Sequence, residues 1–416
     1  MKERQLQWKN SMAIIRQKCK MDKLLINTLQ TPCFLLDEKE LGRGINEFYR
    51  SLKRHFAHCI VGYSVKTNSL PYAIVKAKDF GCFAEVVSDD ELDLALECGY
   101  RMNEIVFNGP MKSKTRFLDA LKRGAIVNIE THRELEWLKE LPSDGLYKIG
   151  IRLSVNISDV SLEDAEGEND FSRFGFNDET EEFSNALETV RSIPQVELVG
   201  LHIHRTSHSR SVRFYKRSVA YAASVIKKYH LDLDYLDVGG GYYGIFRNAP
   251  TFDDYVAAIY ESLQKQGLEK LAIIVEPGNA LTASSFTYYS QVIDVKQLPD
   301  CRILTTDGTR NDIDPFFHKN EYMTEINRAN ESGQVVPLQI VAGATCLEYD
   351  QLFRLENQQE MEVGDVIEYK NVGAYTLSLT PMFINYFPRV YSLSSDGLKL
   401  VRDKWTAKEY IQKSNI

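Results

Sequence analysis

The chain has 416 residues, and its 50 lysines and arginines face 58 aspartates and glutamates, for a formal net charge of −8. This length is enough for a large core and for two domains. The negative charge argues against nucleic acid or an anionic membrane as the main partner. No apolar run approaches membrane-spanning length, and residues 1–9 lack the apolar stretch of a secretory signal.

The number and spacing of the cysteines indicate the redox state of the compartment in which the protein works. Seven cysteines are present, an odd number, and no two of them form a CxxC pair. This pattern is typical of a reducing compartment and is unlike a disulfide framework or a zinc ribbon. We therefore expect a cytoplasmic globular protein.

Strand-like and helix-like segments alternate from residue 32 to about residue 279. Each short apolar run precedes a longer helix-like stretch. Repeated units of this kind predict a parallel sheet, and about eight of them would close a (β/α)8 barrel. The strand-like runs cover residues 33–36, 59–63, 82–87, 105–107, 125–127, 148–153, 197–204, 233–238 and 273–275.

The pattern changes after residue 279, where strand-like runs follow one another with few helices between them. This favours a mostly antiparallel β-domain. We expect an α/β protein with a TIM-like barrel over residues 37–279 and a β-domain over residues 280–416, joined by the N-terminal segment 1–36. The runs in the second domain cover residues 287–295, 338–341, 365–369 and 390–393.

Lys66 stands at the end of one barrel strand, directly before a polar Thr-Asn-Ser turn. A residue at this place can offer its amine at the mouth of a barrel. A lysine in a partly dry site loses some of its ammonium character and can form a Schiff base with an aldehyde. A solvated surface lysine is the alternative interpretation.

Two histidines end another strand, where alternation points His202 and His204 to the same side. A flat imidazole at the barrel mouth can stack on an aromatic ring, while a hydrogen-bonded core histidine is the plain alternative. The pair, with His208 nearby, is also typical of a metal-dependent hydrolase. No matching His or Asp cluster follows elsewhere in the predicted barrel, so we expect no metal.

Two more strand ends carry groups that suit a phosphorylated ring. One strand runs into Gly239, Gly240 and Gly241, whose backbone N–H groups can wrap an anion, phosphate by preference. Another strand ends at Glu276 before a Pro-Gly turn. A carboxylate there can keep a pyridine nitrogen protonated, or it can pair with a neighbouring cation.

The second domain contributes a thiol and a phenol. Cys346 lies among small residues and carboxylates, and a thiol there can donate a proton to a carbanion. A buried inert cysteine is the default alternative. Tyr375 follows a Gly-Ala pair and suits either a phosphate hydrogen bond or ordinary packing.

In this order, the motifs resemble those of the fold type III pyridoxal phosphate enzymes, in particular the ornithine, lysine and diaminopimelate decarboxylases. The resemblance covers residues 31–383. It implies a lyase with an alanine racemase-like barrel that binds pyridoxal 5'-phosphate, and a homodimer with shared active sites.

The resemblance also assigns roles to single residues. Lys66 would carry the Schiff base, His204 would stack on the ring and Glu276 would face the pyridine nitrogen. Cys346, reaching in from the partner subunit, would protonate Cα after CO2 leaves. The other positions implied to support the cofactor are Glu85, Arg152, Ser207, Gly239, Gly240, Gly241 and Tyr375.

Several positions depart from the family pattern. Thr206 replaces the glycine of the usual His-x-Gly-Ser, Asn279 replaces an arginine, and Leu347 replaces an acid. Asp314 stands where diaminopimelate enzymes carry arginine, which disfavours a distal carboxylate on the substrate. We therefore expect diaminopimelate to be a poor substrate, and lysine, ornithine or a larger amine-bearing conjugate to be better. The expected substrate-binding residues are Asp307, Asp314, Glu348 and Asp350.

The leading hypothesis is a pyridoxal phosphate-dependent decarboxylase in amino-acid metabolism, acting on an amino acid or an amino-acid-derived intermediate. A racemase with the same barrel is an alternative, although Cys346 in the decarboxylase setting argues against it. A non-catalytic, decarboxylase-like regulatory protein is another, although Lys66 and Glu276 are both present. A metal-dependent barrel hydrolase comes last.

Overall fold

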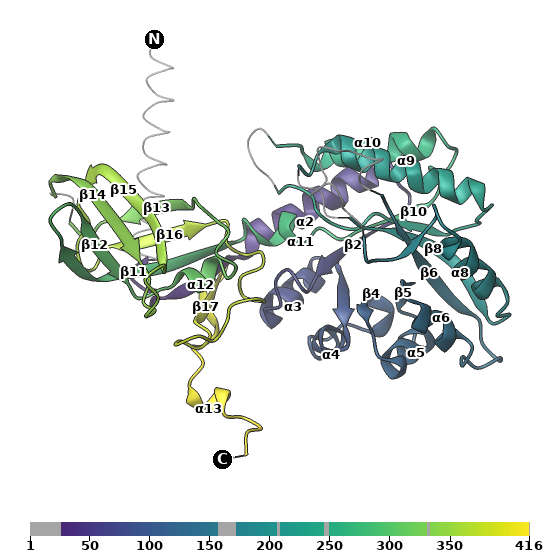
Figure 1. Cartoon of the computed structure of the whole chain (residues 1–416), viewed down its shortest axis with the longest axis horizontal. Helices are drawn as coiled ribbons and strands as arrows, with labels where there is room; N and C mark the ends of the chain where they lie inside the picture. The colour runs from purple at the N-terminus through teal and green to yellow at the C-terminus, as the bar shows by residue number, and fades with distance from the viewer. Residues whose placement is uncertain (1–25, 157–171, 206–208, 245–248, 331–332, 416) are drawn as a thin grey trace, which may run out of the picture. The chain divides into compact units, whose positions relative to one another are not determined.

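The computed structural model describes residues 26–156, 172–205, 209–244, 249–330 and 333–415, and it divides into two compact units (Figure 1). We call Asp37–Ser285 together with Gly373–Ser378 the barrel unit, and the remaining described residues the β unit. Among the described helices, none is long and apolar enough to cross a membrane. The described cysteines are all free thiols.

The barrel unit is built on a closed ring of eight parallel strands. The order around the ring is β5-β4-β3-β2-β10-β9-β8-β6, and the pairing of β5 with β6 closes it. A short strand, β7 (Phe176–Asn177), pairs with β6 outside the ring. The ring strands are β2 (Cys59–Ser64), β3 (Phe83–Ser88), β4 (Ile105–Met111), β5 (Ile126–Ile129), β6 (Tyr147–Ser154), β8 (Val196–Ile203), β9 (Tyr235–Asp237) and β10 (Ala272–Val275).

Helices between the strands surround the ring (Figure 1). α2 shows why: its buried residues Leu41, Ile45, Phe48 and Leu52 recur at helical spacing and form one apolar face. Asp37 caps its start by accepting hydrogen bonds from the second and third backbone N–H groups. The helices are α2 (Glu38–Lys53), α3 (Pro71–Asp79), α4 (Asp89–Glu97), η1 (Met102–Glu104), α5 (Lys114–Lys122), α6 (His132–Leu138), α8 (Glu182–Arg191), α9 (Val212–Lys228), α10 (Phe252–Gln264) and α11 (Gly278–Thr282).

The β unit is one sheet of mostly antiparallel strands. Its main order is β15-β14-β12-β11-β1-β17-β18, with β16 paired to β11 and β13 paired to β16. β12 and β14 are parallel neighbours. The elements are β1 (Cys33–Asp37), β11 (Phe286–Gln297), β12 (Arg302–Thr306), α12 (Arg310–Ile313), β13 (Met323–Asn327), β14 (Val335–Ala342), β15 (Gln351–Gln359), β16 (Val366–Lys370), β17 (Arg389–Ser394), β18 (Gly397–Arg402) and α13 (Ala407–Tyr410).

The predicted fold class, a (β/α)8 barrel with a separate mostly antiparallel β-domain, is confirmed. The first strand-like run of the alternating series lies outside the ring, because β1 pairs antiparallel with β11. In a parallel barrel, the carboxyl ends of all strands meet at one rim, so side chains that follow different strands converge there. This rim is where the candidate site lies.

Candidate active site

A cavity of about 560 Å³ opens at the carboxyl ends of the barrel strands. Its lining includes two histidines, two glutamates and several cationic side chains. The site residues expected from sequence that line it come from six different parts of the barrel unit. They are Lys66, Glu85, Arg152, His204, Glu276 and Tyr375.

Lys66 follows β2, and its side chain is 35% exposed, within the cavity. Its Nζ donates a hydrogen bond to Glu85 Oε2 at 2.5 Å, and the Ser64 hydroxyl donates to the same oxygen at 2.7 Å. Burial opposes the charge of the amine, but the Glu85 carboxylate, which also accepts its hydrogen bond, outweighs the effect of burial, and the pKa of Lys66 is raised to about 12. Without cofactor, Lys66 is therefore an ammonium held by Glu85.

Glu85 lies on β3 and is buried. Burial disfavours its ionisation, but the Lys66 ammonium and the hydrogen bonds from Ser64 and Asn108 lower the pKa of Glu85 below its usual value. Asn108 on β4 donates to Glu85 Oε1 at 3.3 Å. The Lys66–Glu85 pair is thus a charged unit within the barrel wall.

His204 directly follows β8, and its Nδ1 accepts a hydrogen bond from the Gly240 N–H at 3.2 Å. Burial, together with the charges of Arg152 and Lys66, lowers the pKa of His204 to about 3. The imidazole is therefore neutral near pH 7, which suits a group that lies flat against an aromatic ring.

The loop of Gly239, Gly240 and Gly241 follows β9. Gly239 has a φ of +66°, and a Cβ there would lie 2.5 Å from His204 Nδ1. A Cβ on Gly240 would collide with the backbone oxygen of Glu276. Glycine is required because the loop after β9 runs closely between His204, which follows β8, and Glu276, which follows β10.

Arg152 on β6 is buried and holds the wall beside His204. Its Nη1 donates to Glu130 Oε2 at 2.8 Å, and its Nη2 donates to the His204 backbone oxygen at 3.2 Å. The guanidinium also lies 4.7 Å from the centre of the Phe174 ring. These contacts orient His204 and leave Arg152 little freedom.

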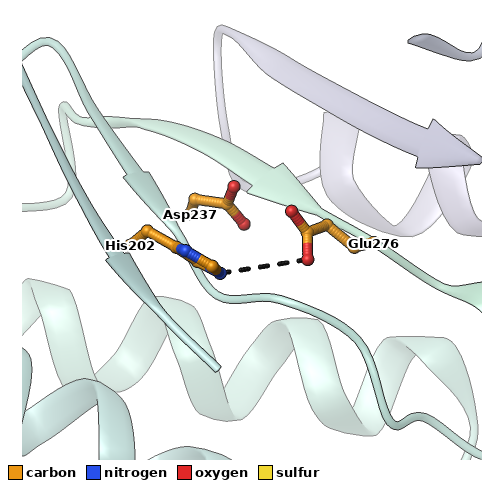
Figure 2. Close-up of side chains that lie close together, drawn as sticks. All are labelled: His202, Asp237 and Glu276. Atoms are coloured by element: carbon orange, nitrogen blue, oxygen red, sulfur yellow. Dashed lines mark ion pairs between the residues drawn. The ribbon is translucent and has the colours of Figure 1, made fainter. Parts of the chain in front are cut away.

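Glu276 follows β10 and is buried. Its Oε1 accepts a hydrogen bond from Asn108 Nδ2 at 2.5 Å, and its Oε2 lies 3.9 Å from His202 Nε2. Figure 2 shows His202, Asp237 and Glu276 turned toward one another. Three such groups are of the kind that can ligate a cation, whereas His208, the third histidine of the metal-hydrolase alternative, lies outside the described residues. The absence of metal stays a prediction.

Tyr375 returns to the barrel unit from a segment far along the chain. Its backbone N–H donates to the Thr67 oxygen at 2.8 Å, and Asn68 Nδ2 donates to the Gly373 oxygen at 2.7 Å. These bonds fix residues 373–378 beside the Lys66 turn. Tyr375 and Lys66 therefore line the same cavity. The predicted contact of Tyr375 with a phosphate stays a prediction, and Ser207 lies outside the described residues.

The remaining expected residues lie in the β unit. Cys346 and Glu348 are exposed in the loop between β14 and β15. Asp350 is buried, and its carboxylate accepts hydrogen bonds from Thr345 N, Thr345 Oγ1 and Arg310 N. Asp350 therefore shapes the loop that carries Cys346.

The two aspartates expected to meet the substrate have partners within the β unit. Asp307 accepts a hydrogen bond from Gln291 N at 2.8 Å, and burial raises the pKa of Asp307. Asp314 accepts from Arg310 Nε at 2.9 Å. Arg310 Nη2 donates in turn to the Lys319 oxygen at 2.7 Å. The Arg310 guanidinium is thus held by groups of its own unit.

Sequence reasoning missed several residues of the cavity. Asn108 follows the 105–107 run, so its place at a strand end was the available signal. Asp237 does not line the cavity but lies beside its residues His202 and Glu276; it ends β9 and was treated only as part of a strand. No pattern pointed to Arg173 or Arg205, which line the same cavity.

Comparisons with known proteins agree with the geometry. Residues 43–283, more than half of the chain, match the family model "Pyridoxal-dependent decarboxylase, pyridoxal binding domain". A diaminopimelate decarboxylase of Helicobacter pylori is 27% identical over 385 residues, covering 90% of this chain and 93% of that protein. The diaminopimelate decarboxylase of Methanocaldococcus jannaschii is 26% identical over 406 residues, covering 93% and 91%. A crystal structure of the M. jannaschii enzyme with L-lysine aligns with a TM-score of 0.81 at 24% identity over 94% of each chain, which supports the fold.

Proposed function

Because the chain belongs to the pyridoxal-dependent decarboxylase family, we propose that Lys66 carries its cofactor as a Schiff base and that Cys346 of the partner subunit protonates Cα. Family membership confirms three expectations from sequence: the family itself, pyridoxal 5'-phosphate as cofactor, and a carboxy-lyase that acts on an amino acid. The roles of single residues, the substrate and the dimer are the proposal.

The residues present fit pyridoxal phosphate. The glycine loop packs so closely against His204 and the Glu276 backbone that a Cβ at Gly239 or Gly240 would collide with them, and its backbone lies bare of side chains. Within the described residues, Arg152 Nε and both ring nitrogens of His202 are buried without a hydrogen-bond partner. A cavity of about 560 Å³ is large enough for a cofactor and a small substrate. The glycine loop and the place of Tyr375 in the cavity wall support Gly239, Gly240, Gly241 and Tyr375 as holders of the phosphate, and Ser207 is added from the resemblance alone.

When bound, the cofactor supplies an aldehyde for a lysine amine and a ring that accepts the electrons of the broken Cα–carboxylate bond. Lys66 must lose a proton before its amine can react, and Glu85 is the nearest base, at 2.5 Å. Neutral His204 would cover one face of the ring, and Glu276 would face the ring nitrogen. Arg152 positions His204 through its backbone oxygen.

A proton must reach Cα after CO2 leaves, and the proposed donor is Cys346 of the partner subunit. Cys346 is exposed on the β unit, on a loop that buried Asp350 holds in shape. Exposure is what a donor shared between subunits requires, because the thiol must enter a site on another chain. We accordingly propose a homodimer, with residues 37–279 as the cofactor-binding domain and residues 280–416, joined by 1–36, as the β-domain.

The single observation that carries the proposal is the Lys66–Glu85 pair inside the cavity. Borohydride reduction of the holoenzyme, followed by peptide mapping, should place the cofactor on the peptide that contains Lys66. Lys66→Ala should lose the visible absorption of the lysine-bound cofactor and nearly all CO2 release. Cofactor fixed to another lysine would contradict the assignment.

The substrate is proposed from the departures noted in the sequence. Arg310 is held by Asp314 and the Lys319 oxygen, so it is not poised to receive a substrate carboxylate. We expect lysine or ornithine, or a larger amine-bearing conjugate, to be turned over with a higher kcat/KM than meso-diaminopimelate. A CO2-release assay across these amino acids measures this, and a preference for diaminopimelate would contradict it. Product chirality in the same assay would reveal a racemase.

A further inference from the structure

Three buried side chains converge at the ends of three neighbouring barrel strands (Figure 2), and two of them, His202 and Glu276, line the cavity. His202 comes from β8, Asp237 ends β9 and Glu276 follows β10, and their nearest ligand atoms all lie within 4.8 Å of one another. All three are almost entirely buried. Two carboxyl groups this close cannot both be charged without a cation or a proton between them.

The hydrogen bonds of Asp237 favour its charged form. Its Oδ1 accepts the Gly239 N–H at 3.0 Å, and its Oδ2 accepts from Asn128 Nδ2 at 3.2 Å. The orientation of the Asn128 amide is fixed, because its Oδ1 accepts from the Tyr235 hydroxyl and its Nδ2 also donates to Asn108 Oδ1. Both oxygens of Asp237 therefore face N–H donors, which stabilise a carboxylate.

Glu276 accepts fewer hydrogen bonds that would stabilise its charged form. Its Oε1 accepts one bond, from Asn108, and its Oε2 faces His202 at 3.9 Å, too far for a hydrogen bond. Burial and the nearby Arg152 lower the pKa of His202 well below its usual value, so the ring is neutral.

Among the described residues, no lysine or arginine donates a hydrogen bond to Glu276 or Asp237. Lys66 donates to Glu85, and Arg152 donates to Glu130 and to the His204 oxygen. Neutral His204 adds no charge. The excess proton of the pair belongs on Glu276, where it can be shared with Asp237.

We propose that Asp237 is a positioning residue that keeps Glu276 protonated in the cofactor-free protein, so that Glu276 itself delivers the proton of the ring nitrogen. The inference rests on the proposed placement of Glu276 at that nitrogen. As the cofactor binds, the O–H bond of Glu276 breaks, an N–H bond forms on the ring, and Glu276 becomes a carboxylate. Above its pKa of about 7, Asp237 is a carboxylate before and after this step, and no proton is taken from solvent.

The pKa shifts agree with this assignment. Burial first, and then the charges of Asp237 and Glu85, raise the pKa of Glu276 well above its usual value. Burial raises the pKa of Asp237 to about 7, while its bonds to Gly239 and Glu276 act in the opposite direction. Asp237 is thus the stronger acid of the pair.

Asp237 contacts both the protonated Glu276 and the glycine loop. It accepts the N–H of Gly239, the first residue of the loop proposed to hold the phosphate. One side chain therefore orients both the phosphate loop and the carboxyl group at the opposite end of the cofactor. This explains why an aspartate, rather than a neutral side chain, ends β9.

An infrared difference spectrum between the full chain with and without pyridoxal phosphate tests the proposal. The cofactor-free protein should show the carbonyl stretch of a buried protonated carboxyl, and this band should disappear when the cofactor binds. Glu276→Gln should lack the band. Asp237→Asn should weaken it, because removal of the aspartate charge lowers the pKa of Glu276.

Calorimetry of cofactor binding in buffers of different ionisation heat gives a second readout. Asp237→Asn should take up roughly one more proton per site from solvent than wild type, since Glu276 no longer brings it. Asp237→Glu, which keeps the charge, should bind cofactor without this extra uptake, and it replaces the asparagine variant if that variant fails to fold.

Outcomes that overturn the inference are distinct from failure of the proposed function. If the cofactor binds to Lys66 but the cofactor-free protein shows no carboxyl band, this inference is wrong while the proposed function stands. A band retained in Glu276→Gln would assign the proton elsewhere. Stoichiometric binding of Zn²⁺ by the cofactor-free wild type, lost in His202→Gln, would make the cluster a metal site instead. Failure to label Lys66 would overturn the proposed function.

Discussion

Buried ionisable side chains in the barrel unit make the stability of the cofactor-free protein depend on pH. Asp237 and Glu276 have raised pKa values in the folded state, so the folded chain holds protons that the unfolded chain releases. For such groups, stability is greatest below the unfolded pKa and falls as pH rises through the folded pKa. For Asp237 this window runs from 3.8 to about 7.

Glu276→Gln should remove part of this dependence. Glutamine imitates the protonated acid, since it can accept from Asn108 and donate to Asp237. Between pH 5 and pH 8, wild type should lose on the order of 2 kcal/mol more of its unfolding free energy than the variant. Denaturant unfolding of the cofactor-free proteins measures this. Exposed Glu188 on α8 offers a control, and Glu188→Gln should leave the wild-type slope unchanged. Equal slopes in all three proteins would contradict the prediction.

The glycine loop allows a sharper test at a single residue. Gly239→Ala should weaken binding of pyridoxal phosphate at least tenfold, or about 1.4 kcal/mol, because the new Cβ meets His204 Nδ1 at 2.5 Å. Gly267→Ala is the matched control: its φ is +68°, but nothing lies within 4 Å of the added carbon. Both variants carry similar backbone strain, so a difference in their cofactor affinity comes from the collision of the new Cβ with His204. Equilibrium dialysis measures cofactor affinity, and an equal loss in both variants would refute the argument.

Among the elements, a buried ion pair joins two neighbouring βα units of the barrel. Lys112, just after β4, donates to Glu134 Oε1 on α6 at 2.7 Å and to the oxygens of Gly109 and Asn128. Both side chains are essentially unexposed. A buried charge that loses its partner destabilises a protein far more than the pair itself stabilises it.

Lys112→Met should therefore lower the unfolding free energy by about 3–5 kcal/mol. The cause is the Glu134 carboxylate, which would stay buried without its cation. Lys139→Met is the control, because Lys139 pairs with Glu136 on the surface of the same helix region and should cost under about 1 kcal/mol. Thermal and denaturant unfolding compare the two, and similar small losses would show that the buried pair is dispensable.

The elements of the barrel could be predicted from sequence because their signal is local. A strand followed by a helix shows in the spacing of apolar residues, and Lys66, His204 and Glu276 drew attention because each follows a strand. The carboxyl network could not be found in this way. Asn108 meets Glu276 from 168 residues away, and Asn128 meets Asp237 from 109. Such pairs become visible only when the ring closes.

The position of β1 outside the ring could not be predicted either, because it depends on a partner far along the chain. Its apolar run reads like the first strand of the alternating series. Its register against β11 pairs Cys33 with Tyr289, more than 250 positions later. The same limit applies to residues 373–378, whose bonds to the Lys66 turn lie within the barrel unit although their sequence neighbours belong to the β unit.

At the scale of the whole molecule, the proposed catalytic groups divide between the two units. Lys66, Glu85, His204 and Glu276 line one cavity of the barrel unit, whereas Cys346 lies on the β unit. The Cys346 loop also exposes one large aromatic side chain. Tyr349 on this loop is 61% exposed and packs edge-on against Phe317. Tyrosine is among the residues enriched in surfaces that another chain covers.

A complementation experiment tests whether two chains share each site. Lys66→Ala and Cys346→Ala should each be nearly inactive as homodimers, the first for lack of the amine and the second for lack of the acid. In a closed two-fold dimer with shared sites, a mixed dimer combines both defects in one site and leaves the other intact. Random exchange makes half of the dimers mixed, so the mixture should recover roughly a quarter of wild-type activity. Mixing Lys66→Ala with Lys66→Ala Cys346→Ala is the control, and it should recover nothing because no chain supplies the amine. No recovery in the first mixture after exchange is verified by mass spectrometry would place the acid and the lysine on the same chain.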